Sequence, residues 1–344
     1  MALSAGVETQ DQGSSPAGGR DGDPALDSVT AIVLTHNEER NIGACLDSIR
    51  PFRNVMVVDS GSSDSTLEIC RAQGIEPVFH AYENHASQWR WALDTLPIAT
   101  AWVLALDADF IVTAELADRL RRDIASMSDD VGGIYVRHRY RFGWGDIRFG
   151  GTKQSWLRII RVGLAQPDSG DLVDFRFVVD GRVATWPEAV VEYNRNDDDI
   201  SVWIGKQDKF ALRLAVEEEL RRRHLHGWSG RPRLLGTTDE RFAWLRDRWL
   251  WMPLFVRPVI YFLYRYVLAL GFLDGRAGFL YAALQGFWLR LIVDWKTVEL
   301  RKLELSDGEL TAFSREMMTT RSGSVTAVGL AQVRIKNPTA DIHP

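Results

Sequence analysis

Two carboxylates that follow an apolar strand give the strongest chemical signal in the sequence. Asp107 and Asp109 come directly after the aliphatic run at residues 103–106. Because side chains alternate across a strand, positions i and i+2 point to one face, so both carboxylates can reach one site at the edge of a sheet. Such a pair favours a hard divalent ion, Mg²⁺ or Mn²⁺, which takes carboxylates together with substrate phosphates. A solvated strand end is the plainer alternative.

A second carboxylate, Asp59, ends another buried run and begins the segment Asp-Ser-Gly-Ser-Ser-Asp-Ser-Thr at residues 59–66. Gly61 permits a tight turn, and Ser63 or Asp64 can cap the helix that follows. For the serines a turn and a cap is the preferred interpretation. Asp59 differs, because an acceptor at the last strand position can take the imide N–H of a pyrimidine base. The segment lacks the G-x-G-x-x-G spacing, which disfavours a dinucleotide site.

The first apolar strand ends in the same way, with Thr35, Asn37 and Glu38. Glu38 can simply favour a helix N-terminus. Beside Asp59 on a neighbouring strand, it would line the same pocket. Gln88 lies on a predicted helix and is followed by Trp89 and Trp91, and an amide there is as compatible with the surface as with a ligand contact.

Aliphatic runs alternate with helical periodicity over the first 127 residues. Strands are predicted at 29–34, 54–58, 77–79 and 101–106, with helices at 37–49, 64–73, 86–96 and 114–127. This order predicts an α/β fold, Rossmann-like, with a mixed but mainly parallel sheet that binds ligands at the carboxyl ends of its strands. Strand-like pieces at 133–137, 156–160 and 175–179 are expected to form the acceptor half of the same domain.

From residue 200 the chain becomes helical, with apolar stripes that include Trp203 and Leu214, and later Val259 and Tyr266. Beyond residue 306 the apolar periodicity fades. The predicted organisation is a disordered tail at 1–28, the α/β domain at 29–196, a basic, Trp-rich helical region at 197–305 and a loosely ordered tail at 306–344. The first 27 residues lack a basic start followed by an apolar run, so no signal peptide is expected.

Charge and cysteine usage limit the class of partner. A net charge of −5 argues against a nucleic-acid binder, yet residues 221–302 hold fifteen Lys or Arg against six Asp or Glu, and six of the thirteen Trp. Such a segment indicates an anionic surface as partner. Cys45 and Cys70 lie in helical patterns, so a disulfide or zinc site is not expected and a reducing cytoplasm fits.

The basic segment is too interrupted to cross a bilayer as one helix, which needs about 18 apolar residues. The interruptions are Arg257, Arg265, Asp274, Arg276 and Arg290. Aromatic residues interleaved with Arg are typical of helices that lie in the membrane interface, where the basic groups meet anionic headgroups. The expected location is therefore cytoplasmic, peripheral on the inner face of the cell membrane. Packing of these helices on the α/β domain or on a second subunit is the alternative, and the oligomeric state is left open.

In their order and spacing, these motifs resemble glycosyltransferase family 2, whose catalytic domain has the GT-A fold, nearest the lipopolysaccharide core glucosyltransferase branch. The resemblance covers about residues 30–295 and rests on segments 35–39, 57–66, 88–93 and 106–109, with a tail pattern at 272–279. It implies a nucleotide-sugar site formed by Thr35, Asn37, Glu38, Asp59, Gln88 and Asp107, and a Mg²⁺ or Mn²⁺ ion positioned on the diphosphate by Asp107 and Asp109.

The resemblance further implies an inverting transfer from a nucleotide-diphosphate-sugar, with a UDP-sugar expected, to a lipid-linked or cell-envelope glycan. The family shows Arg-Asn after the glutamine, where this chain has Trp89-Arg90. The family's base usually sits in a His-Glu pair before a Val-Val-Asp-Gly strand, and this chain has Asp174-Phe175 there. Asp174 is the predicted general base, with Asp171 next, while Asp180 before Gly181 is assigned to a hairpin turn.

Two other functions compete with glycosyl transfer. An apolar strand ending in Asp-x-Asp also resembles the first motif of aspartyl-nucleophile phosphatases, although the later Lys and acidic pair of that class are not located in the sequence. The fold could also bind a nucleotide-sugar or glycan without turning it over. Metal-dependent binding that is specific for the diphosphate of a nucleotide-sugar would distinguish a glycosyltransferase from a phosphatase. Hydrolysis or transfer of the sugar would exclude a protein that only binds it.

Overall fold

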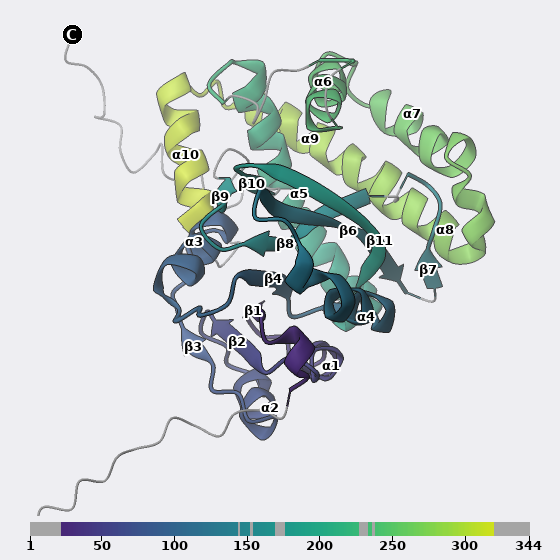
Figure 1. The fold of residues 1–344 in the computed structure, drawn as a ribbon. Coiled ribbons are helices and arrows are strands. Elements are labelled where there is room, and N and C mark those ends of the chain that lie inside the picture. Colours follow the sequence, from purple (N-terminus) through teal and green to yellow (C-terminus); the bar gives the residue numbers. More distant parts are fainter. Residues whose placement is uncertain are drawn as a thin grey trace, which may run out of the picture.

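The computed structural model describes residues 22–143, 145–151, 154–168, 176–226, 233–235 and 238–319. A central sheet has the strand order β3-β2-β1-β4-β8-β6-β11-β5, with β7 paired to β6, and β9 and β10 form a separate ribbon (Figure 1). The strands are β1 (Val29–Thr35), β2 (Asn54–Asp59), β3 (Val78–Phe79), β4 (Trp102–Asp107), β5 (Phe110–Val112), β6 (Val131–Phe142), β7 (Gly145–Ile147), β8 (Gln154–Arg161), β9 (Ala165–Asp168), β10 (Arg176–Val179) and β11 (Arg182–Glu192).

The parallel part of the sheet matches the predicted alternation of strands and helices. All seven residues of β1 are buried between two neighbours, as expected for a parallel strand covered on both faces. The register pairs Thr35 with Asp59 on one side and Leu34 with Asp107 on the other. Three of the predicted site residues therefore come to one edge because parallel strands end together.

The second half of the sheet is mixed in direction. β8 runs antiparallel to both β4 and β6, β11 runs parallel to β6, and β5 antiparallel to β11. The mainly parallel but mixed sheet is as predicted, whereas β11 itself was not. Its pairing with β6 shifts between Thr185 and Ala189, around Pro187. A bulge suits proline, which cannot donate to the ladder, and it hides the strand pattern in the sequence.

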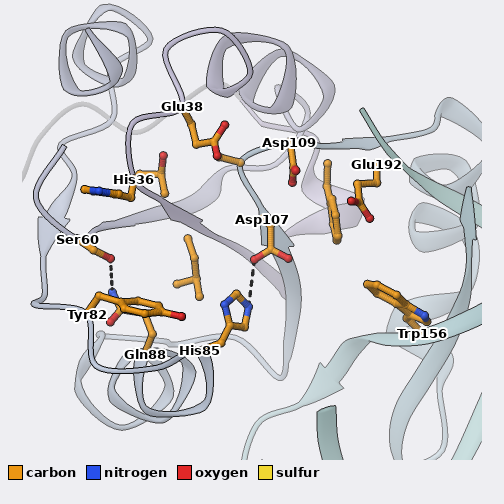
Figure 2. A pocket seen from close by; sticks show the side chains of 14 residues that line it. His36, Glu38, Ser60, Tyr82, His85, Gln88, Asp107, Asp109, Trp156 and Glu192 are labelled. Carbon is orange, nitrogen blue, oxygen red and sulfur yellow. Dashed lines mark hydrogen bonds and ion pairs between the residues drawn. The ribbon is translucent and has the colours of Figure 1, made fainter. Parts of the chain in front are cut away.

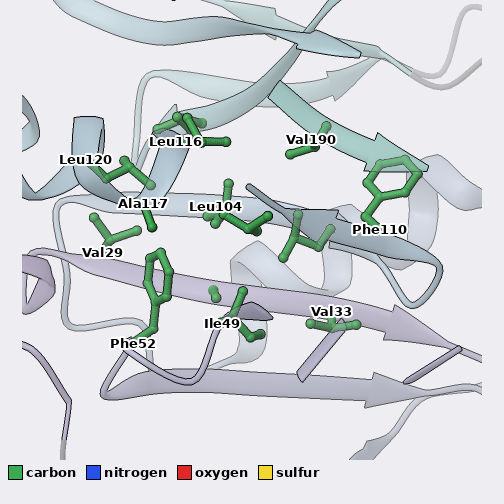
Figure 3. Close-up of a cluster of buried hydrophobic side chains, with 14 of the residues drawn as sticks. Val29, Val33, Ile49, Phe52, Leu104, Phe110, Leu116, Ala117, Leu120 and Val190 are labelled. Atoms are coloured by element: carbon green, nitrogen blue, oxygen red, sulfur yellow. The ribbon is translucent and has the colours of Figure 1, made fainter. Parts of the chain in front are cut away.

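The helices of the first half are α1 (Ile42–Ser48), α2 (Thr66–Ala72), α3 (His85–Thr95), α4 (Ala114–Asp123) and the short η1 (Pro24–Leu26) and η2 (Ile124–Ser126). α1, α2 and α4 are shorter than predicted, whereas α3 has the predicted length. α1 does not begin at Asn37, which has a left-handed φ of 54° and turns the chain first. Helices and sheet enclose a core in which Leu104 lies near Ile49, Phe52 and Leu116 (Figure 3). The tail predicted at 1–28 already contributes Leu26 to this core. Cys45 and Cys70 are buried and free, without a disulfide.

The rest of the described chain is helical, as predicted. It comprises η3 (Arg195–Asp198), α5 (Ile200–Arg222), α6 (Thr238–Leu250), α7 (Arg257–Leu263), η4 (Tyr264–Leu268), η5 (Gly271–Asp274), α8 (Gly275–Tyr281), η6 (Ala282–Trp288), α9 (Leu289–Lys302) and α10 (Asp307–Thr319). α10 lies inside the stretch predicted as a loose tail, where Leu310 and Phe313 pack against Val216 of α5. Phe142, Trp203 and Ala277 form the apolar cluster that joins the sheet to these helices.

Two arginines predicted to meet lipid headgroups point inward instead. Arg257 is 1% exposed and Arg265 is 8% exposed. The Asp274 carboxylate likewise bonds within the protein, because it accepts the backbone N–H groups of Arg148 and Phe149 at 2.9 and 2.8 Å. In the described part of the chain no single helix is long and apolar enough to cross a membrane, while the bent pair Arg257–Leu268 and Gly271–Lys302, at 69°, passes that test together.

Candidate active site

A cleft of about 370 Å³ opens at the carboxyl ends of β1 and β4 (Figure 2). Four carboxylates from different parts of the chain, Glu38, Asp107, Asp109 and Glu192, surround it. It is lined by Leu34, Thr35, His36, Glu38, Ser60, Tyr82, His85, Gln88, Asp107, Ala108, Asp109, Phe110, Trp156 and Glu192. Five residues predicted from the sequence therefore share one cleft, namely Thr35, Glu38, Gln88, Asp107 and Asp109.

On the β1 side, the cleft holds a polar group that the protein itself does not satisfy. The Thr35 hydroxyl is buried, with the residue 5% exposed, and it has no hydrogen-bond partner among the described residues. A buried hydroxyl without a partner costs free energy, so this atom is suited to a bound ligand. Beside it, Glu38 is held by Asn41, whose Nδ2 donates to Oε2 at 2.6 Å, and burial raises the pKa of the Glu38 carboxyl.

Asn37 and Asp59 do not line the cleft but shape the loop beside it. The Asp59 carboxylate accepts the N–H groups of Gly61 and Ser62 at 2.7 and 2.9 Å, and the Ser62 hydroxyl at 2.5 Å. Asn37 fixes the same loop through its Oδ1, which accepts the Ser63 N–H at 2.8 Å. A carboxylate has about four acceptor positions, so Asp59 keeps one for a ligand.

Gln88 is buried and its amide is engaged on both sides. Its Oε1 lies 2.7 Å from His80 Nδ1, and its Nε2 donates to the Ser60 hydroxyl at 3.0 Å. The alternative of a surface amide is thus wrong, and Gln88 positions Ser60 at the cleft wall. The next residues, where the chain departs from the family, face away: Trp89 is fully buried and Arg90 donates to the carbonyl of Pro167.

Asp107 stands between the side chains of His85 and Arg158. His85 Nε2 is 3.3 Å from its Oδ1, and Arg158 Nη1 is 3.5 Å from its Oδ2. Burial raises the pKa of Asp107, but His85 and Arg158 outweigh it and bring the pKa down to about 2. Arg158 is itself buried and stacks over Phe110 at 4.5 Å. Asp107 is therefore fully ionised and already neutralised by the protein.

Asp109 reaches the cleft by a different route from the one predicted. It belongs to a turn between β4 and β5 and not to the strand, so strand alternation does not explain why it faces the same cleft as Asp107. Its Oδ2 accepts from Asn194 Nδ2 at 3.1 Å. Burial raises the pKa of Asp109 well above its usual value, and Glu192, Asp107 and Glu38 raise it further. The surroundings of Asp109 therefore disfavour its ionised form, and a cation beside it would relieve the repulsion.

Glu192 and His138 were not identified from the sequence. Glu192 ends β11, and its Oε2 lies 2.7 Å from Nε2 of His138, which stacks on Trp156 with ring centroids 4.0 Å apart. The signal was present, since Glu192 follows the aliphatic residues 189–191 just as Asp107 follows its own run. The predicted base, Asp174, and its alternative Asp171 lie outside the described residues.

The donor atoms present fit a divalent ion only with help from a ligand. Among the residues that the structure describes, no group of three or more His, Cys, Asp or Glu could hold a metal. Asp109, with its raised pKa, and Asp107 supply oxygen ligands at the cleft, which suits an ion that also takes phosphate oxygens.

Comparison with known proteins places this cleft in a family. Residues 30–170 match the model of glycosyl transferase family 2. The lipopolysaccharide core biosynthesis glycosyltransferase LpsC of Rhizobium meliloti is 26% identical over 160 residues, which cover 45% of this chain and 58% of LpsC. An uncharacterized glycosyltransferase of Rickettsia conorii is 30% identical over 105 residues, 30% of this chain and 36% of that protein. The chain therefore spans between about a third and three fifths of these relatives.

Among solved structures, glucosyl-3-phosphoglycerate synthase from Mycobacterium tuberculosis with Mn²⁺ and UDP-glucose aligns with a TM-score of 0.27 and 20% identity, over 34% of this chain and 45% of that one. Mannosyl-3-phosphoglycerate synthase from Rubrobacter xylanophilus covers 35% of this chain and 44% of its own. The family match and the relatives, together with the carboxylates gathered where the strands end, lead to one conclusion. Over residues 30–170 the chain is similar to glycosyl transferase family 2.

Proposed function

We propose that this glycosyltransferase moves a sugar from a nucleotide-diphosphate-sugar, expected to be a UDP-sugar, to a lipid-linked or cell-envelope glycan. The observation that carries the proposal is the cleft at the strand ends, which the unsatisfied Thr35 hydroxyl and four carboxylates line together. The acceptor class is supported by the similarity to LpsC, a glycosyltransferase of lipopolysaccharide core biosynthesis.

The donor would lie across the edge formed by β1, β2 and β4. Thr35 offers a free hydroxyl, and Asp59 offers its remaining acceptor position to a base N–H. Asn37 and Gln88 contribute by fixing the walls, namely the loop at 60–63 and the Ser60 hydroxyl. Glu38, held by Asn41, offers a second acceptor beside the same strand end.

Asp109, with Asp107 beside it, would hold Mg²⁺ or Mn²⁺ against the diphosphate. When bound, such an ion supplies positive charge for the departing diphosphate. Asp107 is held in place by His85 and Arg158, and its pKa of about 2 keeps it ionised at neutral pH. A single displacement inverts the configuration of the sugar carbon and requires a base for the acceptor hydroxyl.

For that base the described site offers Glu192. Its carboxylate is about a quarter exposed, opens to the cleft, and is oriented by His138. Asp174, predicted from the sequence, stays a prediction. Glu192 would approach from the acceptor half of the domain, since it ends β11.

A thermal-shift panel of UDP-, GDP- and dTDP-sugars, with and without Mn²⁺, tests the donor site. We expect stabilisation by a nucleotide-sugar that depends on the metal and is lost in Asp109→Asn. Asp94→Asn, which alters an exposed carboxylate on α3, is the matched control and should keep the response. Phosphate release from a phosphoester without any nucleotide-sugar would favour the phosphatase instead. Binding without nucleotide release, when envelope glycolipid extract is supplied, would leave only a binding protein.

A further inference from the structure

One surface of the helical region is apolar throughout. Between Trp251 and Leu273, every residue that is exposed is hydrophobic or aromatic. We call this set the apolar face: Trp251, Pro253, Phe255, Val256, Val259, Ile260, Leu263, Tyr264, Val267, Leu268, Leu270, Phe272 and Leu273. It lies on residues 251–256 before α7, on α7 and on the chain through η4 and η5, and Figure 1 places α7 at the edge of the molecule away from α2 and α3.

The charged residues of the same segment are turned inward. Arg257 lies between two carboxylates, with Nη2 2.6 Å from Glu218 Oε2 and Nε 2.6 Å from Asp294 Oδ1. Asp294 is 0% exposed. Arg265 donates to the carbonyl of Gly150 at 2.8 Å and lies 4.6 Å from the ring of Tyr281. The segment thus hides its charges and exposes its hydrocarbon, the reverse of a helix that faces water.

An arrangement of this kind is costly in water and favourable against lipid. Water-soluble surfaces rarely carry a contiguous apolar patch of this extent without a partner. In a lipid environment, charged side chains face the protein interior and pair with one another, as Arg257 does with Glu218 and Asp294.

Exposed arginines border the apolar face. Arg248 precedes Trp251 and Arg276 follows Leu273, and both are exposed. Arg148, with its side chain 71% exposed, lies in the loop that Asp274 holds against η5. A hydrocarbon surface with a basic rim complements a bilayer with anionic headgroups, where apolar groups enter the acyl boundary and cations stay at the surface.

We propose that the apolar face inserts into the interface of an anionic lipid bilayer, with Arg148, Arg248 and Arg276 on the headgroups. The surface stands independently of the proposed function. Its consequence for the acceptor rests on that function: Tyr140 pairs in register with Glu192 and its ring lies 5.1 Å from Tyr281, behind the apolar face. The acceptor side of the cleft is therefore the side nearest the bilayer.

Vesicle flotation of the full chain, without donor or acceptor, tests the proposal. Wild type should float with vesicles of phosphatidylcholine and phosphatidylglycerol. Leu268→Lys/Leu273→Lys removes apolar contact but adds positive charge at sites 75% and 54% exposed, and should weaken partitioning by roughly tenfold or more. Leu235→Lys, at a site 96% exposed outside the face, is the matched control and should bind as wild type.

Three results would overturn the proposal. Wild type could fail to float with any vesicle, or the double variant could float as well as wild type, in which case surface charge alone drives adsorption. The third result would come from sedimentation equilibrium. If wild type were a dimer and the double variant a monomer, and neither floated with vesicles, the apolar face would be a subunit interface. Because these sites are exposed, thermal unfolding of the variants should match wild type. If the wild-type protein floated with vesicles but showed no glycosyl transfer, the proposed function would fail and the membrane proposal would still hold.

Discussion

Asp107 and Asp109 are expected to respond to substitution in opposite ways. Asp109 has a pKa raised by burial and by neighbouring carboxylates, so Asp109→Asn relieves repulsion and should leave the free energy of unfolding unchanged or higher. Asp107→Asn leaves the buried Arg158 without its carboxylate and should lower that free energy by roughly 3 kcal/mol. Urea unfolding of the two proteins measures the difference. Equal stability would mean that Asp107 does not neutralise Arg158.

Both substitutions are expected to abolish metal-dependent transfer, but for Asp107→Asn the stability loss must be separated from catalysis. Measuring transfer at a temperature below the unfolding midpoint of Asp107→Asn makes this separation. The activity of Asp94→Asn is the reference for a carboxylate substitution outside the cleft. If Asp109→Asn turned over donor at the wild-type rate with Mn²⁺, the carboxylate would not serve the metal.

Glu192→Gln is expected to lower turnover by roughly 100-fold or more, because a general base typically contributes that much. Donor binding, measured by thermal shift, should stay near wild type, since Glu192 lies across the cleft from Thr35. Asp174→Asn is measured in parallel. A comparable loss in Asp174→Asn, with full turnover in Glu192→Gln, would return the base to the position predicted from the sequence.

Local sequence rules identified the residues of β1, β2 and β4 because aliphatic runs that end in a polar residue mark parallel strands. They did not identify Arg158 or Glu192, which come from strands whose order in the sheet follows from long-range pairing. Nothing local indicates that Arg158 on β8 will face Asp107 on β4. Pro187 further obscured β11, and the turn holding Asp109 was taken as strand.

At the scale of elements, close backbone contact fixes α8 against η5. A Cβ on Gly278 would lie 2.1 Å from the carbonyl oxygen of Gly271, so no side chain fits there. Gly278→Ala should lower the free energy of unfolding by about 1–3 kcal/mol through overpacking. Gly205, inside α5, has nothing within 4 Å of an added Cβ, and Gly205→Ala should instead raise stability by about 0.5–1 kcal/mol.

Thermal unfolding of both alanine variants checks this pair. A Gly278→Ala protein as stable as wild type would mean that η5 and α8 can separate without cost. The same contact explains the tail pattern at 272–279: Gly278 permits the approach, and Asp274 ties it to the backbone of residues 148 and 149.

Across the whole molecule, α5 couples the α/β domain to the helices behind it. Trp203 near its start packs with Phe142 of β6 and with Ala277 of α8, while Leu214 packs with Val293 of α9. The cleft and the apolar face therefore belong to one continuous structure, and the integrity of α5 bears on both.

The whole protein should lose stability in acid through one residue of α5, Glu219. It is 1% exposed and accepts from Arg222, Arg223 and Arg301, the last of these on α9. Burial raises the pKa of Glu219, but the hydrogen bonds from these three arginines outweigh it and lower the pKa from 4.5 to about 2. The unfolded chain thus binds a proton first, so the stabilisation is complete above pH 4.5 and is lost as pH falls toward 2. Its size is roughly 3 kcal/mol.

Glu219→Gln removes the charge at every pH. We expect it to lower the free energy of urea unfolding strongly at neutral pH, and the gap from wild type to narrow as pH falls below 4.5. Glu304→Gln, at an exposed acidic site after α9, is the matched control and should track wild type throughout. The difference in unfolding free energy between Glu219→Gln and wild type could instead stay constant down to the lowest pH measured. Glu219 would then act through packing and not through its charge, and α5 would not cause the acid sensitivity of the fold.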